Sequence, residues 1–169
     1  MNTTLQTDAE VVEEADVSEM RGKYLTFWTD KQLFGVPISS VVQIVGMQEI
    51  TEVPEYPPYA KGIIYLRGSI IPLIDTRLRL GKPEASYNER TCIIVTSIME
   101  YLIGFIVDEV DAVISIPDDQ ISPPPQLNGQ AGGYIIGIGK LERKVVLLMD
   151  TCKIIGNETL DILANAGTL

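Results

Sequence analysis

The sequence predicts a mainly β protein built from two small five-stranded barrels with short helical turns. Two observations support this fold class: short apolar strands separated by turns at regular spacing, and a sequence pattern that occurs twice. Ten short strands in two sets of five favour two closed barrels over one open sheet.

The repeat is clearest in one apolar run. Residues 70–76 (IIPLIDT) recur 75 residues later as residues 145–151 (VVLLMDT). Two half-length units imply two similar modules, which we expect at 23–81 and 91–156 with the polar linker 82–90 between them. The cleft between two such modules is the first place to look for a binding site.

Each strand is predicted from its apolar pattern and the turn that follows it. Residues 24–29 and 32–36 form a hairpin around Asp30-Lys31, and residues 92–97 and 101–107 form another around Met99-Glu100. The remaining strands are expected at 41–45, 61–66, 69–75, 110–116, 134–138 and 144–149. Pro72 fits the strand 69–75 only at an edge or a bulge, because proline has no amide hydrogen.

Asp75 and Asp150 each end an apolar strand and are followed by threonine. Pairs of this kind are similar to those of two-lobed aspartic proteases, but that chemistry needs a glycine after each threonine, and neither is present. Aspartate as N-cap with Gly81 or Gly156 after it predicts one short helical turn in each half. An acid protease using the two aspartates is therefore only a remote alternative.

Charge is unevenly distributed along the 169 residues, whose net charge is −10. Residues 1–22 contain six acidic residues and one arginine, so we expect an acidic flexible N-terminal tail there, and a C-terminal tail at 157–169. The absence of a basic footprint argues against nucleic acid as a partner. No apolar run approaches the roughly 20 residues that a membrane span needs, so we expect no membrane insertion and a cytoplasmic location.

The residue inventory argues against catalysis. There is no histidine, which removes the usual general base and the usual zinc ligand. Asp108, Glu109 and Asp111 cluster, but their spacing matches no calcium loop. Cys92 and Cys152 have no metal-binding spacing, and we expect both to be buried free thiols. The sequence thus predicts no metal, no cofactor and no enzymatic site.

Arg67 lies at the predicted turn between the strands 61–66 and 69–75. Its counterpart in the second half is Glu142, so the repeat does not explain the arginine. A cation at a rigid turn can make forked hydrogen bonds to a partner carboxylate. A solvated turn residue is an equally good interpretation of the same pattern.

The segment 61–77 (KGIIYLRGSIIPLIDTR), together with FGVPI at 34–38, VVQI at 41–44, VDEV at 107–110 and YIIGIG at 134–139, resembles the CheW family. These are adaptor proteins of bacterial chemotaxis arrays, and the resemblance runs from about residue 24 to residue 155. It implies a CheW-like domain at 23–156 made of two SH3-like β-barrel subdomains.

The resemblance also implies a function. The protein is expected to be a non-enzymatic adaptor that couples chemoreceptor signalling tips to the histidine kinase CheA, in the cytoplasm at the receptor array on the inner face of the membrane. A CheW-like adaptor of a pilus, gliding or other kinase pathway is the alternative.

Site residues follow from the positions of the family motifs, since the receptor tip is held near the groove between the barrels. The residues expected to bind the receptor are Ile38, Val41, Gln43, Ile44, Gly62 and Arg67. Those expected to bind either kinase or receptor are Gly104, Val110 and Val113. The chain departs from the family at Gln43, where glutamate is common, and at Tyr65, where asparagine is common. A neutral Gln43 loses a charge-assisted contact, so we expect partner specificity to differ.

Overall fold

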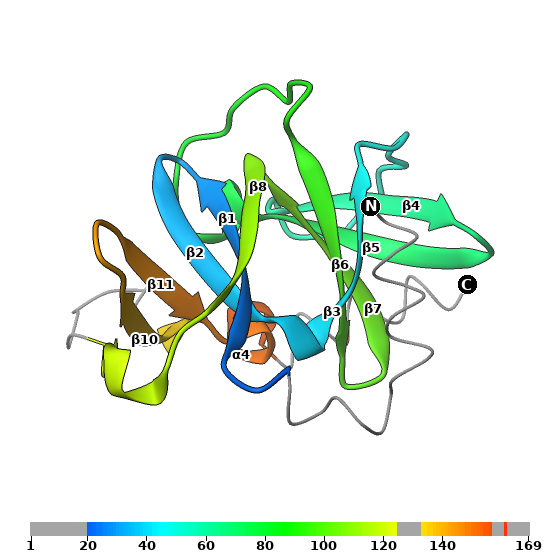
Figure 1. Ribbon diagram of the computed structural model, residues 1–169. Helices are drawn as coiled ribbons and strands as arrows, with labels where there is room; N and C mark the ends of the chain where they lie inside the picture. The colour runs from blue at the N-terminus through cyan, green and yellow to red at the C-terminus, as the bar shows by residue number, and fades with distance from the viewer. Residues whose placement is uncertain (1–19, 125–132, 157–160, 162–169) are drawn as a thin grey trace.

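The structure is a computed structural model that describes residues 20–124, 133–156 and 161, and it contains two β-sheets (Figure 1). The expected tails 1–22 and 157–169 lie outside the described residues, apart from residues 20–22 and 161. In sheet order, the six-stranded sheet contains β8 (Glu109–Ser115), β1 (Lys23–Thr29), β2 (Gln32–Pro37), β11 (Val145–Met149), β10 (Ile135–Lys140) and β9 (Ile121–Ser122). The five-stranded sheet contains β3 (Val41–Gly46), β6 (Cys92–Ile98), β7 (Tyr101–Val107), β5 (Ser69–Asp75) and β4 (Ala60–Leu66).

The predicted strands and both predicted hairpins are confirmed, and the short strand β9 is added to them. Asp30 and Lys31 have positive φ in the β1–β2 turn, and the β6–β7 turn repeats this geometry. Such turns match the right-handed twist of the strands they join. Pro72 lies where β5 has only β4 as a neighbour, because the pairing of β5 with β7 begins at Leu73.

Each sheet draws strands from both halves of the sequence. β11 runs parallel to β2 with Leu148 opposite Gly35, and β5 runs parallel to β7 with Leu73 opposite Gly104. These two pairings are equivalent under the sequence repeat, so the halves exchange strands reciprocally. The predicted mainly β fold with two β subdomains is confirmed, and only the strand count differs. The sheets have six and five strands, and neither hydrogen-bonded ladder closes on itself within the described residues. The repeat boundaries 23–81 and 91–156 remain a prediction, because the sheets cut across them.

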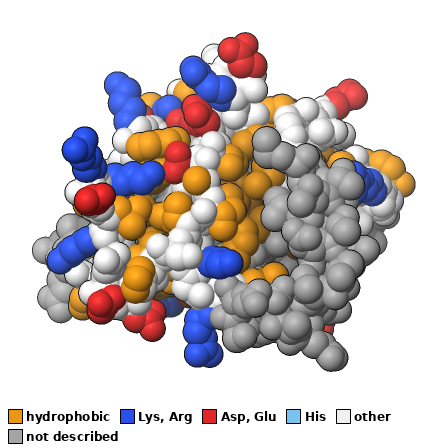
Figure 2. All heavy atoms as spheres, in the orientation of Figure 1, with side chains coloured by type: hydrophobic (Ala, Val, Ile, Leu, Met, Phe, Trp, Pro, Cys, Tyr) orange, Lys and Arg blue, Asp and Glu red, His pale blue; other side chains and the backbone are white. Residues whose placement is uncertain are grey.

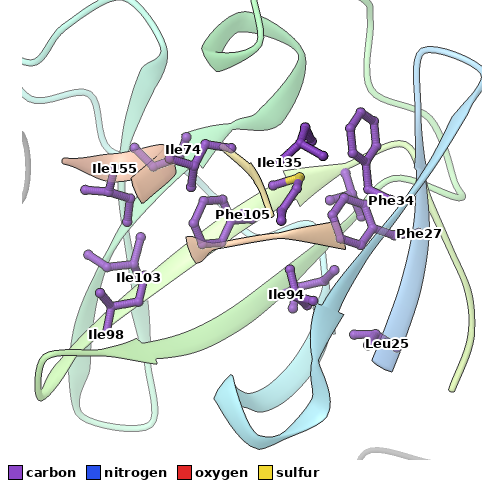
Figure 3. Packing of buried hydrophobic residues seen from close by; sticks show 14 of the residues in the cluster. Leu25, Phe27, Phe34, Ile74, Ile94, Ile98, Ile103, Phe105, Ile135 and Ile155 are labelled. Carbon is purple, nitrogen blue, oxygen red and sulfur yellow. The ribbon is translucent and has the colours of Figure 1, made fainter. Parts of the chain in front are cut away.

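Three apolar clusters hold the sheets together. One belongs to the five-stranded sheet and includes Ile64, Leu73 and Ile93, and a second belongs to the six-stranded sheet around Val146 and Leu148. The third, which we call the shared core, takes side chains from both sheets, and these point into one space (Figure 3). Its members include Leu25, Phe27, Phe34, Val36, Ile94, Ile98, Ile103, Phe105 and Val107. Burial on both faces explains the apolar runs at 92–95 in β6 and 102–107 in β7.

The two predicted helical turns are confirmed as α3 (Thr76–Arg79) and α4 (Thr151–Ile155). Asp75 accepts a hydrogen bond from the Leu78 amide, and Asp150 accepts from the amides of Cys152 and Lys153. Short 3-10 turns η1 (Ile38–Ser40) and η2 (Asp118–Gln120) complete the described elements. None of the described helices is long and apolar enough to cross a membrane.

The expectation of two buried thiols is wrong for Cys152, which is exposed, while Cys92 is half-buried. Cys152 follows the first residue of α4. A four- or five-residue helix buries only part of its circumference, so an apolar neighbourhood in sequence did not place this side chain inside.

Candidate functional site

Strand β3 forms one edge of the five-stranded sheet, and a bulge orients its side chains. The pairing of β3 with β6 shifts register between Val41 and Gln43, so that Val41 lies opposite Thr96 and Ile44 lies opposite Ile94. Directly opposed residues share a face of the sheet, and a bulge changes the face on which the following residues lie. Val41 and Ile44, three residues apart, therefore both lie on the face that carries the shared core.

Strand β8, at the edge of the six-stranded sheet, has a bulge of the same kind. Its pairing with β1 shifts register between Thr26 and Phe27, so that Val110 lies opposite Phe27 and Val113 opposite Leu25. Leu25 and Phe27 belong to the shared core. Val110 and Val113 thus extend the same face of this sheet outward.

We group the apolar residues that these two edge strands and η1 place at the margin of the shared core, and call the group the inter-sheet rim. It consists of Ile38, Val41, Ile44, Val110 and Val113. The first four are partly buried and pack against the shared core, while Val113 is 48% exposed. In Figure 1, the edge strands β8 and β3 lie on the face of the molecule that is turned toward the viewer. Figure 2, in the same orientation, shows hydrophobic side chains in the middle of this face. Two edge strands with apolar side chains at the margin of one core can receive an amphipathic element of a partner.

Three of the expected site residues lie inside the protein instead. Gln43 is buried and lies opposite Val95, which belongs to the core of the five-stranded sheet. Gly62 and Gly104 are also buried: a Cβ on Gly62 would lie 2.2 Å from the Thr51 carbonyl oxygen, and one on Gly104 would lie 2.6 Å from Leu73 Cδ2. Both glycines are explained by close packing of neighbouring chain.

Arg67 is exposed at the tip of the β4–β5 hairpin, with a φ of 51°. β4 and β3 lie at opposite edges of the five-stranded sheet, and the hairpin projects away from β8 in Figure 1. Arg67 is therefore separate from the inter-sheet rim. Beside it lies an exposed cross-strand pair, Tyr65 (72% exposed) with Ile70 (38% exposed). Sequence analysis noted Tyr65 as a departure from the family but did not predict its exposed pairing with Ile70.

An ion-pair network fixes the start of β8. Arg77 donates from Nη2 to Asp108 Oδ2 at 2.8 Å and from Nε to Oδ1 at 2.9 Å, while the Asp30 amide donates to Oδ2 at 2.8 Å. Burial acts to raise the pKa of Asp108, but the hydrogen bonds from Arg77 and the Asp30 amide lower it overall. This network connects α3, the β1–β2 turn and the β7–β8 junction, and so spans both sheets.

The acidic residues near β8 are engaged within the protein. Asp108 binds Arg77, and Asp111 accepts from the Thr26 hydroxyl at 2.8 Å. Across the described residues, no three His, Cys, Asp or Glu side chains are grouped to hold a metal ion. Asp75 and Asp150 each cap their own helix. The geometry is that of a binding scaffold: two sheets share a core, and apolar side chains of two edge strands lie at its margin.

Comparison with known proteins identifies the kind of scaffold. The CheW-like domain family matches residues 23–159, and the chain belongs to this family of chemotaxis adaptors. The Chemotaxis protein CheW of Klebsiella aerogenes is 31% identical over 157 residues, covering 89% of this chain and 95% of its own length. Protein FrzA of Myxococcus xanthus is 30% identical over 104 residues, covering 62% and 65%. The crystal structure of the scaffolding protein TtCheW from Thermoanaerobacter tengcongensis aligns with a TM-score of 0.73 and 34% identity, covering 76% of this chain and 88% of that one.

Proposed function

We propose that this protein couples the cytoplasmic tip of a chemoreceptor to the histidine kinase CheA, and that the inter-sheet rim is the receptor site. Membership of the CheW family supports the pair of partners, and the rim supports the location of the receptor site. The proposal places the protein in the cytoplasm, at the receptor array on the inner face of the membrane. It requires no catalysis and no cofactor.

The observation that carries the proposal is the matched pair of bulges. They place Val41 and Ile44 on one edge strand, and Val110 and Val113 on the other, at the margin of one apolar core. Receptor tips engaged by this family are helical hairpins, and a helix that fills an apolar groove contributes anchors three or four residues apart. Completing the burial of a half-exposed valine is worth about 1 kcal/mol, roughly half of the ~1.5–3 kcal/mol gained by burying a fully exposed one.

Val113→Asp is the variant that tests the rim most directly, because its 48% exposure lets the chain fold with the charge in water. Burying an unpaired carboxylate under a partner costs at least ~1.4 kcal/mol more than burying valine, which is a tenfold loss of affinity. We expect affinity for a receptor-tip fragment to fall at least ~10-fold while affinity for the CheA regulatory domain is unchanged. Ile136→Asp, on β10 of the same sheet with 43% exposure, is the matched control and should bind both partners normally.

The two affinities also decide between partners for β8. If Val113→Asp loses CheA binding but keeps receptor binding, β8 belongs to the kinase site instead. Equal behaviour of Val113→Asp and Ile136→Asp toward both partners would remove the rim from the proposal. An adaptor of another kinase pathway is the second candidate, favoured by the resemblance to FrzA, and binding to a non-chemotaxis kinase but not to CheA would select it.

A further inference from the structure

A hollow of about 370 Å³ lies on the six-stranded sheet at the end of β1 away from the chain's start. Four apolar and three polar or charged side chains line it. They are Trp28, Leu33, Val145 and Leu147, with Lys31, Gln32 and Lys144. Val145 is 54% exposed, so part of this apolar surface is open to solvent. We call this site the lysine hollow.

Among the described residues that line the lysine hollow, the charged side chains are Lys31 and Lys144, both positive, although the whole chain carries −10. Lys31 is exposed in the β1–β2 turn, and the Lys144 side chain is 44% exposed with Asp111 at 3.4 Å as its partner. On the side of the molecule where Figure 1 places β2 and β11, Figure 2 shows several basic side chains with acidic ones among them. An occupant with negative charge and small apolar side chains would complement this surface.

We propose that the lysine hollow binds residues 8–19 of the same chain. This stretch (DAEVVEEADVSE) contains six acidic residues, three valines and no basic residue, and it lies outside the described residues. From the start of β1 to Trp28 the distance is roughly 17 Å at ~3.3 Å per strand residue. Twelve extended residues span up to ~40 Å, which is more than enough. Attachment to the same chain raises the effective concentration to the millimolar range, so weak contacts suffice.

Trp28 is the chain's single tryptophan, and it lines both the lysine hollow and a neighbouring hollow that contains Asp108 and Glu109. Its emission therefore reports on both, and the lysine variants below separate the two contributions. We expect full-length protein to show a Trp28 emission that shifts when salt shortens the Debye length from ~30 Å at 0.01 M to ~3 Å at 1 M. Lys31→Glu with Lys144→Glu should abolish the salt-dependent shift. Changing the six acids of residues 8–19 to lysine in that background should restore it. Lys153→Glu, an exposed lysine on α4, is the control and should keep the shift.

Zero-length carbodiimide cross-linking then locates the contact. We expect Lys31 or Lys144 to be joined to Glu13, Glu14 or Asp16 of the same molecule, as shown by mass spectrometry of mixed isotope-labelled and unlabelled protein. Cross-links found only between molecules would assign the hollow to a second copy and overturn the proposal. A salt response equal in wild type and in the double lysine variant, or failure of the charge swap to restore it, would also overturn the proposal.

Discussion

Replacement of Gly62 by alanine tests whether this residue acts by packing or by contact with a partner. Gly62 lies in β4 with a φ of 143°, which L side chains rarely adopt. A Cβ there would lie 2.2 Å from the Thr51 carbonyl oxygen and 2.9 Å from Ile50 Cγ2. The Thr51 segment cannot move away freely, because Thr51 and Ile63 exchange two backbone hydrogen bonds of 2.9 Å.

The expected cost has two parts. Backbone strain at such a φ costs ~1–3 kcal/mol, and overpacking against a fixed backbone atom costs ~1–3 kcal/mol more. Gly62→Ala should therefore lower the free energy of unfolding by about 2–6 kcal/mol, a large part of the ~5–15 kcal/mol that a domain has. Two other glycines separate the cost of backbone strain from the cost of overpacking. Gly68→Ala has positive φ but nothing within 4 Å, so it should lose ~1–3 kcal/mol, and Gly46→Ala, with neither feature, should stay within ~0.5 kcal/mol.

Urea denaturation of the three variants is the assay, with the midpoint and slope measured for each. The reasoning fails if Gly62→Ala is no less stable than Gly68→Ala, since the contact with Thr51 would then contribute nothing. Receptor affinity measured on the fraction that remains folded supplies the functional half of the test. If folded Gly62→Ala protein binds no receptor, Gly62 contacts the receptor directly.

Two further perturbations follow from the charged residues. Arg77→Ala should cost roughly 1 kcal/mol at pH 7 because the pair with Asp108 is partly exposed. The pKa of Asp108 is lowered on folding, so this contribution is complete above about pH 3.9 and is lost as pH falls through the folded pKa. Wild-type and variant stabilities measured against pH should therefore converge in acid. A stability difference that persists at low pH would contradict this. Arg67→Ala, at an exposed turn, should change stability by no more than ~0.5 kcal/mol yet weaken a partner or uncouple kinase activation, whereas a collapse of the melting temperature would make Arg67 structural.

The strands and helical turns were predicted well because each depends on interactions between residues close together in the sequence. The hairpin around Asp30 needed only a turn between two apolar runs, and the caps at Asp75 and Asp150 needed only an aspartate before a helical turn. The pairing of strands was beyond such signals. That Leu148 lies opposite Gly35, and Leu73 opposite Gly104, depends on contacts between residues distant in sequence.

The candidate site divides in the same way. The spacing of Val41 with Ile44, and of Val110 with Val113, was visible in the sequence, but a spacing of three puts residues on opposite faces of a regular strand. Only the bulges revealed by the register bring each pair to one face. The burial of Gly62 and Gly104 could not be predicted either, because the sequence does not distinguish a glycine that permits close packing from one that faces a partner.

By itself the sequence determined a β protein with a repeated pattern, two capped helical turns and the motifs of its family, since each of these depends on near neighbours in the chain. Tertiary structure decided the exchange of strands between halves, the shared core and the rim at its margin. The physical reason is that apolar burial has no direction of its own: many pairings would bury the same side chains, and only packing of the whole chain selects one.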